Sequence, residues 1–218
     1  MFIGHFGVGL AAKPLARQTS LGTLFLASQF IDLLWPTFLL LGVESVRIVP
    51  GDTRLTPLAF SHYPWSHSLL AVVGWAVLFA VVYFVMRRSV RAALVCGSLV
   101  LSHWVLDLVS HRPDLPLYPG GAERLGLGLW NRPVTAILVE SAIFATGAWL
   151  YWRSTRPVSR AGSIAFWALV GLLAFIYAGN LAGPPPPSEQ AIAWVSQAQW
   201  LIVALGYYVD HNREPRSR

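Results

Sequence analysis

Three ionisable residues lie four positions apart near the end of a long apolar stretch, namely His103, Asp107 and His111. At 100° per residue they spread over about 80° of a helix surface, so their side chains point the same way. Neutral imidazole and carboxylate groups are ligands of zinc and similar divalent ions. The spacing therefore predicts a metal-binding face on this helix. The alternative interpretation is a hydrogen-bonded pair of His103 and Asp107 that joins two helices.

The composition is that of an integral membrane protein. Of the 218 residues, 55% are hydrophobic and 12% are charged, and the mean hydropathy is +0.54. Soluble domains are usually about a quarter charged. A short apolar stretch, 2–12, precedes Pro14 and predicts a re-entrant or half-membrane helix. Longer stretches, each near the ~20 residues that a membrane-spanning helix needs, occupy 21–43, 65–86, 92–110, 134–152, 164–182 and 192–208.

These elements predict a single all-α membrane domain over residues 1–218, a polytopic bundle of about six transmembrane helices plus the short N-terminal helix. The basic residues predict its orientation. With six spans, eleven of the sixteen Lys and Arg residues fall on one side, and the other side holds Arg47, Arg54, Arg112, Arg124 and Arg132. Because cytoplasmic loops are enriched in basic residues, we expect the C-terminus in the cytoplasm. The net charge of +6 has this origin, and no nucleic-acid partner is expected.

Other ionisable residues fall at similar depths in the membrane. At 1.5 Å per residue from the nearest cytoplasmic basic or polar residue, His5, Asp32 and His103 lie ~18 Å deep and Asp107 ~24 Å deep. A buried charge without a partner costs several kcal/mol, so these groups are expected to meet in the outer half of the membrane. A lone Cys96 rules out a cluster of thiolates. The predicted ligands of a divalent ion, zinc or else Mn, Fe or Mg, are His5, Asp32, His67, His103 and Asp107.

Residues near this group are candidates for proton transfer and for substrate binding. Glu140 lies ~20 Å deep and is the leading candidate for proton transfer, with Asp114 and His111 behind it. The candidate substrate-binding residues, near the outer mouth, are His62, Arg112, Asn131 and Arg132, of which the arginines suit an anionic headgroup.

Structural interpretations of the same residues stay open. His5 lies near the N-terminus, where side chains often sit in water. Asp32 is also suited to pairing with an arginine or to capping a kink before Pro36. Glu140 is equally compatible with a structural hydrogen bond. Asp114 fits an Asx turn, and the Asn131–Arg132 pair fits an anchor at the membrane interface.

Four separated motifs in the first 115 residues or so resemble a known family. They are an early His in GHFGVGLAA (4–12), an Asp near a Pro in FIDLLWP (30–36), a turn ending in His-Ser in SHYPWSHSLL (61–70), and a His-x-x-x-Asp helix in SHWVLDLVSH (102–111). This order resembles the YdjM-like family of bacterial inner-membrane proteins, which are described as metal-dependent hydrolases. The chain departs from the family pattern in having one acid, Asp32, where two are common, and Tyr63-Pro64 where Arg-Gly is usual.

The resemblance implies a bacterial inner-membrane protein with a metal site formed by these motifs. With the depth of the site, it predicts a metal-dependent hydrolase that acts on an ester or phosphoester bond of an amphiphilic, lipid-like substrate. The lipid bilayer is then the expected partner. A metal-ion or proton transporter lined by buried His and Asp residues is the alternative, because such residues also mark transport paths.

Overall fold

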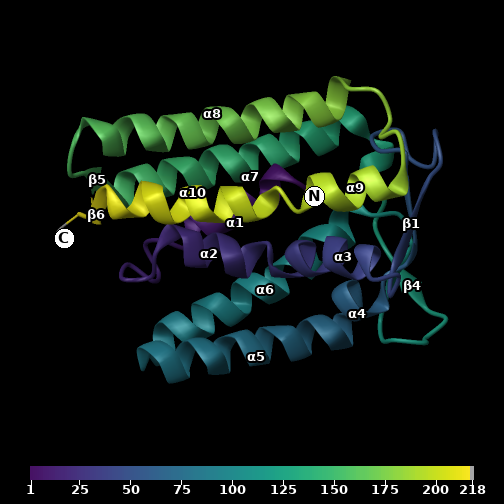
Figure 1. The fold of residues 1–218 in the computed structure, drawn as a ribbon, viewed down its shortest axis with the longest axis horizontal. Coiled ribbons are helices and arrows are strands. Elements are labelled where there is room, and N and C mark those ends of the chain that lie inside the picture. The colour runs from purple at the N-terminus through teal and green to yellow at the C-terminus, as the bar shows by residue number, and fades with distance from the viewer. Residues whose placement is uncertain (217–218) are drawn as a thin grey trace.

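The apolar stretches form helices, which satisfy their own backbone hydrogen bonds as a membrane interior requires. The computed structural model describes residues 1–216, and its helices confirm the predicted all-α bundle (Figure 1). The helices are α1 (Ile3–Ala11), α2 (Leu21–Ser28), α3 (Phe30–Leu40), α4 (Pro64–His67), α5 (Leu69–Arg87), α6 (Val90–Ser110), α7 (Pro133–Ser154), α8 (Arg160–Ala182), α9 (Glu189–Ser196) and α10 (Gln199–His211), with a 3₁₀ turn, η1 (Leu129–Asn131).

Five of these segments are long and apolar enough to cross a membrane within the described residues: α5, α6, α7, α8 and the α9–α10 segment. The α2–α3 pair is a sixth if it counts as one span, because it passes the same test but bends by 58° at a break of one residue. The predicted number of spans is thus confirmed. Helix α1 has the predicted half length, ending three residues before Pro14.

The break between α2 and α3 falls at Gln29, and Pro36 lies inside α3. Proline has no N–H, so it cannot bond to the carbonyl four residues earlier, that of Asp32. The side-chain amide of Gln199 donates to this carbonyl, at 3.4 Å. The bend therefore comes before the proline, and α10 supplies a donor for the carbonyl group that the proline leaves free.

The helices form a stack in which α8 packs against α10, α10 against α2, α2 against α6, and α6 against α5 (Figure 1). Helix α1 packs closely against α7. A Cβ atom on Gly7 would lie 2.8 Å from the backbone of Ile143 and Phe144, and one on Gly147 would meet the carbonyl of Gly7. Only glycine permits this approach, which fixes the position of the short helix and of His5 on it.

Within the described part of the chain, the strands form three short antiparallel pairs at the two ends of the stack. At one end β1 (Ser45–Ile48) pairs with β2 (Leu58–His62), and β3 (Leu115–Pro116) pairs with β4 (Arg124–Leu125). At the other end β5 (Thr155–Pro157) pairs with β6 (Arg213–Pro215). The first two pairs occupy the long loops predicted to face outward.

A buried ion pair lies toward the β5–β6 end. The ammonium group of Lys13 is 2.7 Å from Asp210 Oδ2 and donates to the Thr19 carbonyl, and the Tyr151 hydroxyl donates to Asp210 Oδ1. Side chains of Lys13 and Asp210 are 3% and 12% exposed. This pair is separate from the predicted metal ligands, since fully buried Phe6 and Leu10 come between His5 and Lys13 along α1.

Candidate metal centre

The five predicted metal ligands converge. We call His5, Asp32, His67, His103 and Asp107 the His/Asp cluster. They come from α1, α3, α4 and α6, and the four members other than Asp32 are at most 3% exposed. Ligand atoms of His5, His103 and Asp107 lie within 4.8 Å of one another, as do those of Asp32, His67 and His103. Residues separated by up to 102 positions in the sequence thus form one group of nitrogen and oxygen atoms.

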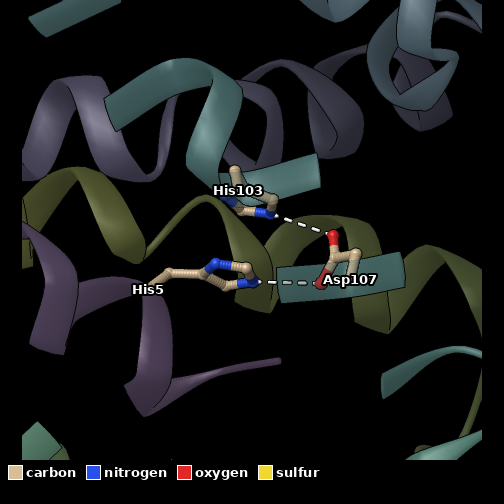
Figure 2. A group of neighbouring side chains, drawn as sticks. All are labelled: His5, His103 and Asp107. Atoms are coloured by element: carbon tan, nitrogen blue, oxygen red, sulfur yellow. Dashed lines mark hydrogen bonds and ion pairs between the residues drawn. The ribbon is translucent and has the colours of Figure 1, made fainter. Parts of the chain in front are cut away.

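Asp107 faces both His5 and His103 (Figure 2). Its Oδ2 is 3.2 Å from His103 Nε2 and 3.8 Å from His67 Nε2. Its Oδ1 is 3.1 Å from His5 Nε2, 3.9 Å from His111 Nε2 and 2.6 Å from the Met1 nitrogen. The two oxygens therefore face different sets of nitrogen atoms.

Asp32 closes the Oδ2 side of the cluster. Its two oxygens lie 3.4 Å from His67 Nε2 and 3.5 Å from His103 Nε2. Its side chain is 22% exposed, the most open of the five. Within residues 1–216 Asp32 pairs with imidazoles on both oxygens, so the predicted alternative, a pairing with an arginine, is not found there.

The position of His103 follows from the break in α2–α3. Ser28 is the last residue of α2, where helix carbonyl groups lack partners within the helix. His103 Nδ1 lies 2.7 Å from the Ser28 carbonyl oxygen. A carbonyl only accepts, so Nδ1 carries the proton and donates, which leaves the lone pair of a neutral His103 on Nε2. That lone pair faces Asp32 and Asp107.

The position of His67 depends on a glutamate 23 residues earlier. Glu44, which is 3% exposed, accepts hydrogen bonds from the backbone N–H groups of Trp65 and Ser66, both at 2.8 Å, and so caps α4. Its Oε2 is 2.6 Å from Ser66 Oγ, which is 2.7 Å from His67 Nδ1. An ionised carboxylate only accepts, so the Ser66 hydroxyl donates to Glu44 and accepts from His67 Nδ1–H. The lone pair of His67 is again on Nε2.

His111 follows the same pattern on the other side of Asp107. Its Nδ1 lies 2.9 Å from Asp114 Oδ1, which also accepts from the Tyr63 hydroxyl at 2.7 Å. Burial and the neighbouring Asp114 carboxylate raise the pKa of Tyr63 well above its usual range, so this hydroxyl stays protonated. Asp114 thus orients His111 instead of forming an isolated turn.

These contacts fit a divalent metal ion. Metal-binding histidines usually donate their other N–H to a carboxylate, a carbonyl or another acceptor, as these three do. Two ligands about 2.0–2.1 Å from one ion are about 3.3 Å apart at a tetrahedral angle, close to the 3.1–3.5 Å contacts above. His103 Nε2 is buried and has no hydrogen-bond partner among the described residues, despite its two carboxylate neighbours. A cation between His103 Nε2 and the carboxylates of Asp32 and Asp107 would satisfy all three.

A cavity of about 810 Å³ opens from the cluster toward α8 and α9. Asp32, His67, Asp107 and His111 line one end of it, with Glu140 nearby. Its walls further along are mainly apolar and include Phe2, Trp35, Phe60, Trp130, Ile176, Leu181, Ile192, Val195 and Ile202. The size is within the ~300–1,000 Å³ of typical ligand sites.

Glu140 lies in the same cavity but is also structural. Its Oε2 accepts from the backbone N–H groups of Phe2, at 2.8 Å, and Gly4, at 3.5 Å, and thereby caps α1. It is 2% exposed. Both interpretations of Glu140 given by the sequence are compatible with this placement.

The predicted substrate-binding residues are more scattered. His62 is exposed and lines a separate, smaller hollow with Tyr63 and Arg124. Arg112 is paired with Asp52 at 2.9 Å and with Asp114 at 3.6 Å. Asn131 and Arg132 are exposed at the start of α7. The structure therefore does not bring these four residues together at the cluster.

Sequence reasoning missed several residues that hold the site. Glu44 and Ser66 orient His67, Tyr63 supports Asp114, and Arg54 lines the cavity. The only signal for Glu44 was a lone acid at the end of the first span. Its role depends on the β1–β2 hairpin, which returns the chain to α4 over 21 residues and leaves no pattern in the sequence.

Comparison with known families places the chain in one of them. A model of the YdjM inner membrane protein matches residues 1–183. The chain belongs to the YdjM inner membrane protein family. The match begins before α1 and runs through α8, so it contains the whole His/Asp cluster and extends well beyond the motifs that first suggested the family. Membership identifies a multi-pass inner-membrane protein. No curated protein and no solved structure matches the chain.

Proposed function

We propose that this YdjM-family protein binds a divalent metal ion, zinc in preference, at the His/Asp cluster and hydrolyses an ester or phosphoester bond of an amphiphile. The observation that carries the proposal is the common orientation of His67, His103 and His111. Each has its Nδ1 engaged by an acceptor and its Nε2 facing a carboxylate. Nitrogen and oxygen donors without thiolate, at one end of a large cavity, are typical of catalytic metal sites.

In this proposal Asp32, His67, His103 and Asp107 hold the ion. Bound there, it supplies Lewis acidity, which polarises an ester or phosphoryl oxygen and makes a water molecule more acidic. Ser28, Glu44 and Ser66 keep the imidazole lone pairs directed inward through the hydrogen bonds described above. The partial exposure of Asp32 leaves that side of the cluster open to the cavity.

Glu140 is the proposed proton carrier, through the oxygen that does not cap α1. The attacking water oxygen bonds to the carbonyl carbon or phosphorus atom, and the ester C–O or P–O bond breaks. Glu140 accepts the proton that the water gives up and returns it to the leaving oxygen. Asp114, already bonded to Tyr63 and His111, acts here as a positioning residue.

The proposed substrate is an amphiphile because the cavity joins a polar end to apolar walls. An alkyl or prenyl chain fits against α8, α9 and α10, where Ile176, Ile192 and Ile202 lie. Arg54, on the β1–β2 loop, is placed to meet an anionic headgroup, in the role first assigned to Arg112 and Arg132. With the loops outward, as the charge bias predicts, the substrate enters from the outer leaflet.

Transport remains the second proposal and is the less favoured one. A transport path needs polar groups that continue across the membrane. Between the His/Asp cluster and the Lys13–Asp210 pair, α1 presents fully buried Phe6 and Leu10. Both side chains belong to an apolar core that also includes Phe25 and Phe144.

The test is metal analysis of purified protein followed by a hydrolysis screen against lipid phosphates and esters. We expect metal in the wild-type protein, its loss in His103→Ala, and its retention in His211→Ala, a histidine exposed at the far end of α10. Activity should follow metal content. A folded His103→Ala protein with full metal content would contradict the proposed site, and metal without hydrolysis in any substrate class would favour transport.

A further inference from the structure

The imidazoles of His5 and His103 are stacked. Their ring centroids are 3.5 Å apart and their planes differ by 8°. Both rings turn Nε2 toward Asp107, but toward different atoms: His5 toward Oδ1, at 3.1 Å, and His103 toward Oδ2, at 3.2 Å (Figure 2). The arrangement is a pair of parallel donors, each in front of its own oxygen of one carboxylate.

One ion cannot bind both imidazoles with good geometry. An imidazole nitrogen binds a metal along its lone pair, which lies in the plane of the ring. An ion midway between two planes ~3.5 Å apart would be about 1.75 Å out of each, and at a metal–nitrogen distance of about 2.1 Å this is roughly 55° out of plane. Two ions, one in the plane of each ring, avoid this distortion.

We propose that the cluster holds two divalent ions bridged by the Asp107 carboxylate, an inference that rests on the proposed metal site. The first ion takes the Oδ2 side, with Asp32, His67 and His103. The second takes the Oδ1 side, with His5 and His111, whose Nε2 atoms are 3.1 and 3.9 Å from Oδ1. The Met1 nitrogen, 2.6 Å from Oδ1, must share this oxygen with the second ion or leave it.

The spacing of the rings agrees with a pair of ions. In two-metal hydrolytic sites the ions are about 3.5–4 Å apart. Two ions that each lie in the plane of one of these rings would have a similar separation, because the ring centroids are 3.5 Å apart. A bridging carboxylate with one oxygen on each ion also explains why Asp107 is nearly fully buried among imidazoles on both sides. A second ion would neutralise more of the charge that develops at a phosphoryl group.

The two sites differ in how their histidines are held. At the first site His103 and His67 each bond through Nδ1 to an acceptor. At the second site only His111 does so, because His5 Nδ1 is buried without a hydrogen-bond partner among the described residues. Outer partners of metal-binding histidines typically change metal affinity by about tenfold to a hundredfold. The second ion should therefore bind more weakly than the first by a factor of this order.

The experiment is a titration of the purified, metal-stripped full chain with Mn²⁺, followed by metal counting and electron paramagnetic resonance. Two equivalents should bind with separated affinities. The hyperfine pattern of isolated Mn²⁺, seen at one equivalent, should give way to the signal of a coupled pair at two. His5→Ala should bind one equivalent and keep the isolated pattern, and the control His211→Ala should behave as the wild type.

The outcomes separate this inference from the proposed function. A single equivalent in the wild type, with the isolated pattern and no change in His5→Ala, overturns the second ion and leaves the single-ion proposal standing. No bound metal overturns both. If His5→Ala fails to fold, the wild-type titration decides, because coupling between two ions is observed without any variant.

Discussion

The hydrogen bond between Ser66 and His67 gives the sharpest test of how the site is held. Ser66→Ala removes the oxygen that accepts from His67 Nδ1–H. His67 is 3% exposed, so water has little access to replace it. A buried donor left without an acceptor costs about 1–3 kcal/mol. The metal-free protein can avoid this cost by moving the proton to Nε2, which then donates to Asp32 at 3.4 Å.

The metal-bound protein cannot change tautomer in this way, because Nε2 must keep its lone pair for the ion. The cost of about 1–3 kcal/mol therefore appears as weaker metal binding, by roughly tenfold to a hundredfold in the dissociation constant. The assay is competition for Zn²⁺ between purified protein and a chromophoric chelator. Ser66→Thr keeps a hydroxyl and should restore most of the affinity.

Ser68→Ala is a matched control. Ser68 is as fully buried as Ser66 and lies two residues away, but its hydroxyl caps α5 by accepting from the Ala71 N–H. Its loss should lower the free energy of unfolding by about 0.5–2 kcal/mol and leave zinc affinity unchanged. Equal zinc affinities for folded Ser66→Ala and Ser68→Ala would refute the role assigned to the hydroxyl.

Three further outcomes follow from the structure. Gly147→Ala places a Cβ against the Gly7 carbonyl, so it should displace α1, lower the free energy of unfolding by about 1–3 kcal/mol and reduce metal content. At the control position, Gly171, a Cβ meets nothing within 4 Å, so Gly171→Ala should change neither quantity. Thermal unfolding and metal analysis measure the two effects. Lys13→Met removes the cation from the buried pair with Asp210, so it should lower the free energy of unfolding by about 3–5 kcal/mol. The zinc dissociation constant should not change, and a change would contradict the separation of this ion pair from the His/Asp cluster. Stripping the metal with a chelator should lower the melting temperature, because an ion at a hundred times its dissociation constant stabilises by about 2.7 kcal/mol; an unchanged melting temperature would show that little folding energy depends on it.

The sequence predicted the helices and the convergence of the ligands for one physical reason. Hydrocarbon offers no partner to an ionisable side chain, so such residues at similar depths meet one another. That reasoning predicted that His5, Asp32, His67, His103 and Asp107 meet, and the structure brings them together as two groups of three that share His103. The residues predicted to bind substrate, His62, Arg112, Asn131 and Arg132, were not brought together at the cluster, because they lie in loops where neither depth nor periodicity restricts their position.

The orientation of each imidazole could not be predicted from the sequence, because it depends on hydrogen bonds with distant backbone and side-chain groups. Ser28 acts through a carbonyl that is available only because α2 ends there. Glu44 acts through a hairpin that returns to α4. No periodic pattern encodes either contact. The positions of the ionisable residues along the apolar stretches thus predicted which residues meet, whereas contacts from the end of α2 and from loop side chains decide which nitrogen of each imidazole faces the centre.

Glu140 shows that a predicted position deep in the membrane does not by itself identify a catalytic residue. A buried carboxylate in a membrane protein needs partners, and the N-terminus of a helix supplies them as well as a metal site does. Glu140 accepts from Phe2 and Gly4 at the start of α1, and α1 carries His5. A Glu140→Gln variant keeps an acceptor for these N–H groups but cannot carry a proton. Loss of hydrolysis with unchanged metal content would therefore assign proton transfer to Glu140. Loss of metal would instead show that the main role of Glu140 is to hold α1 in place.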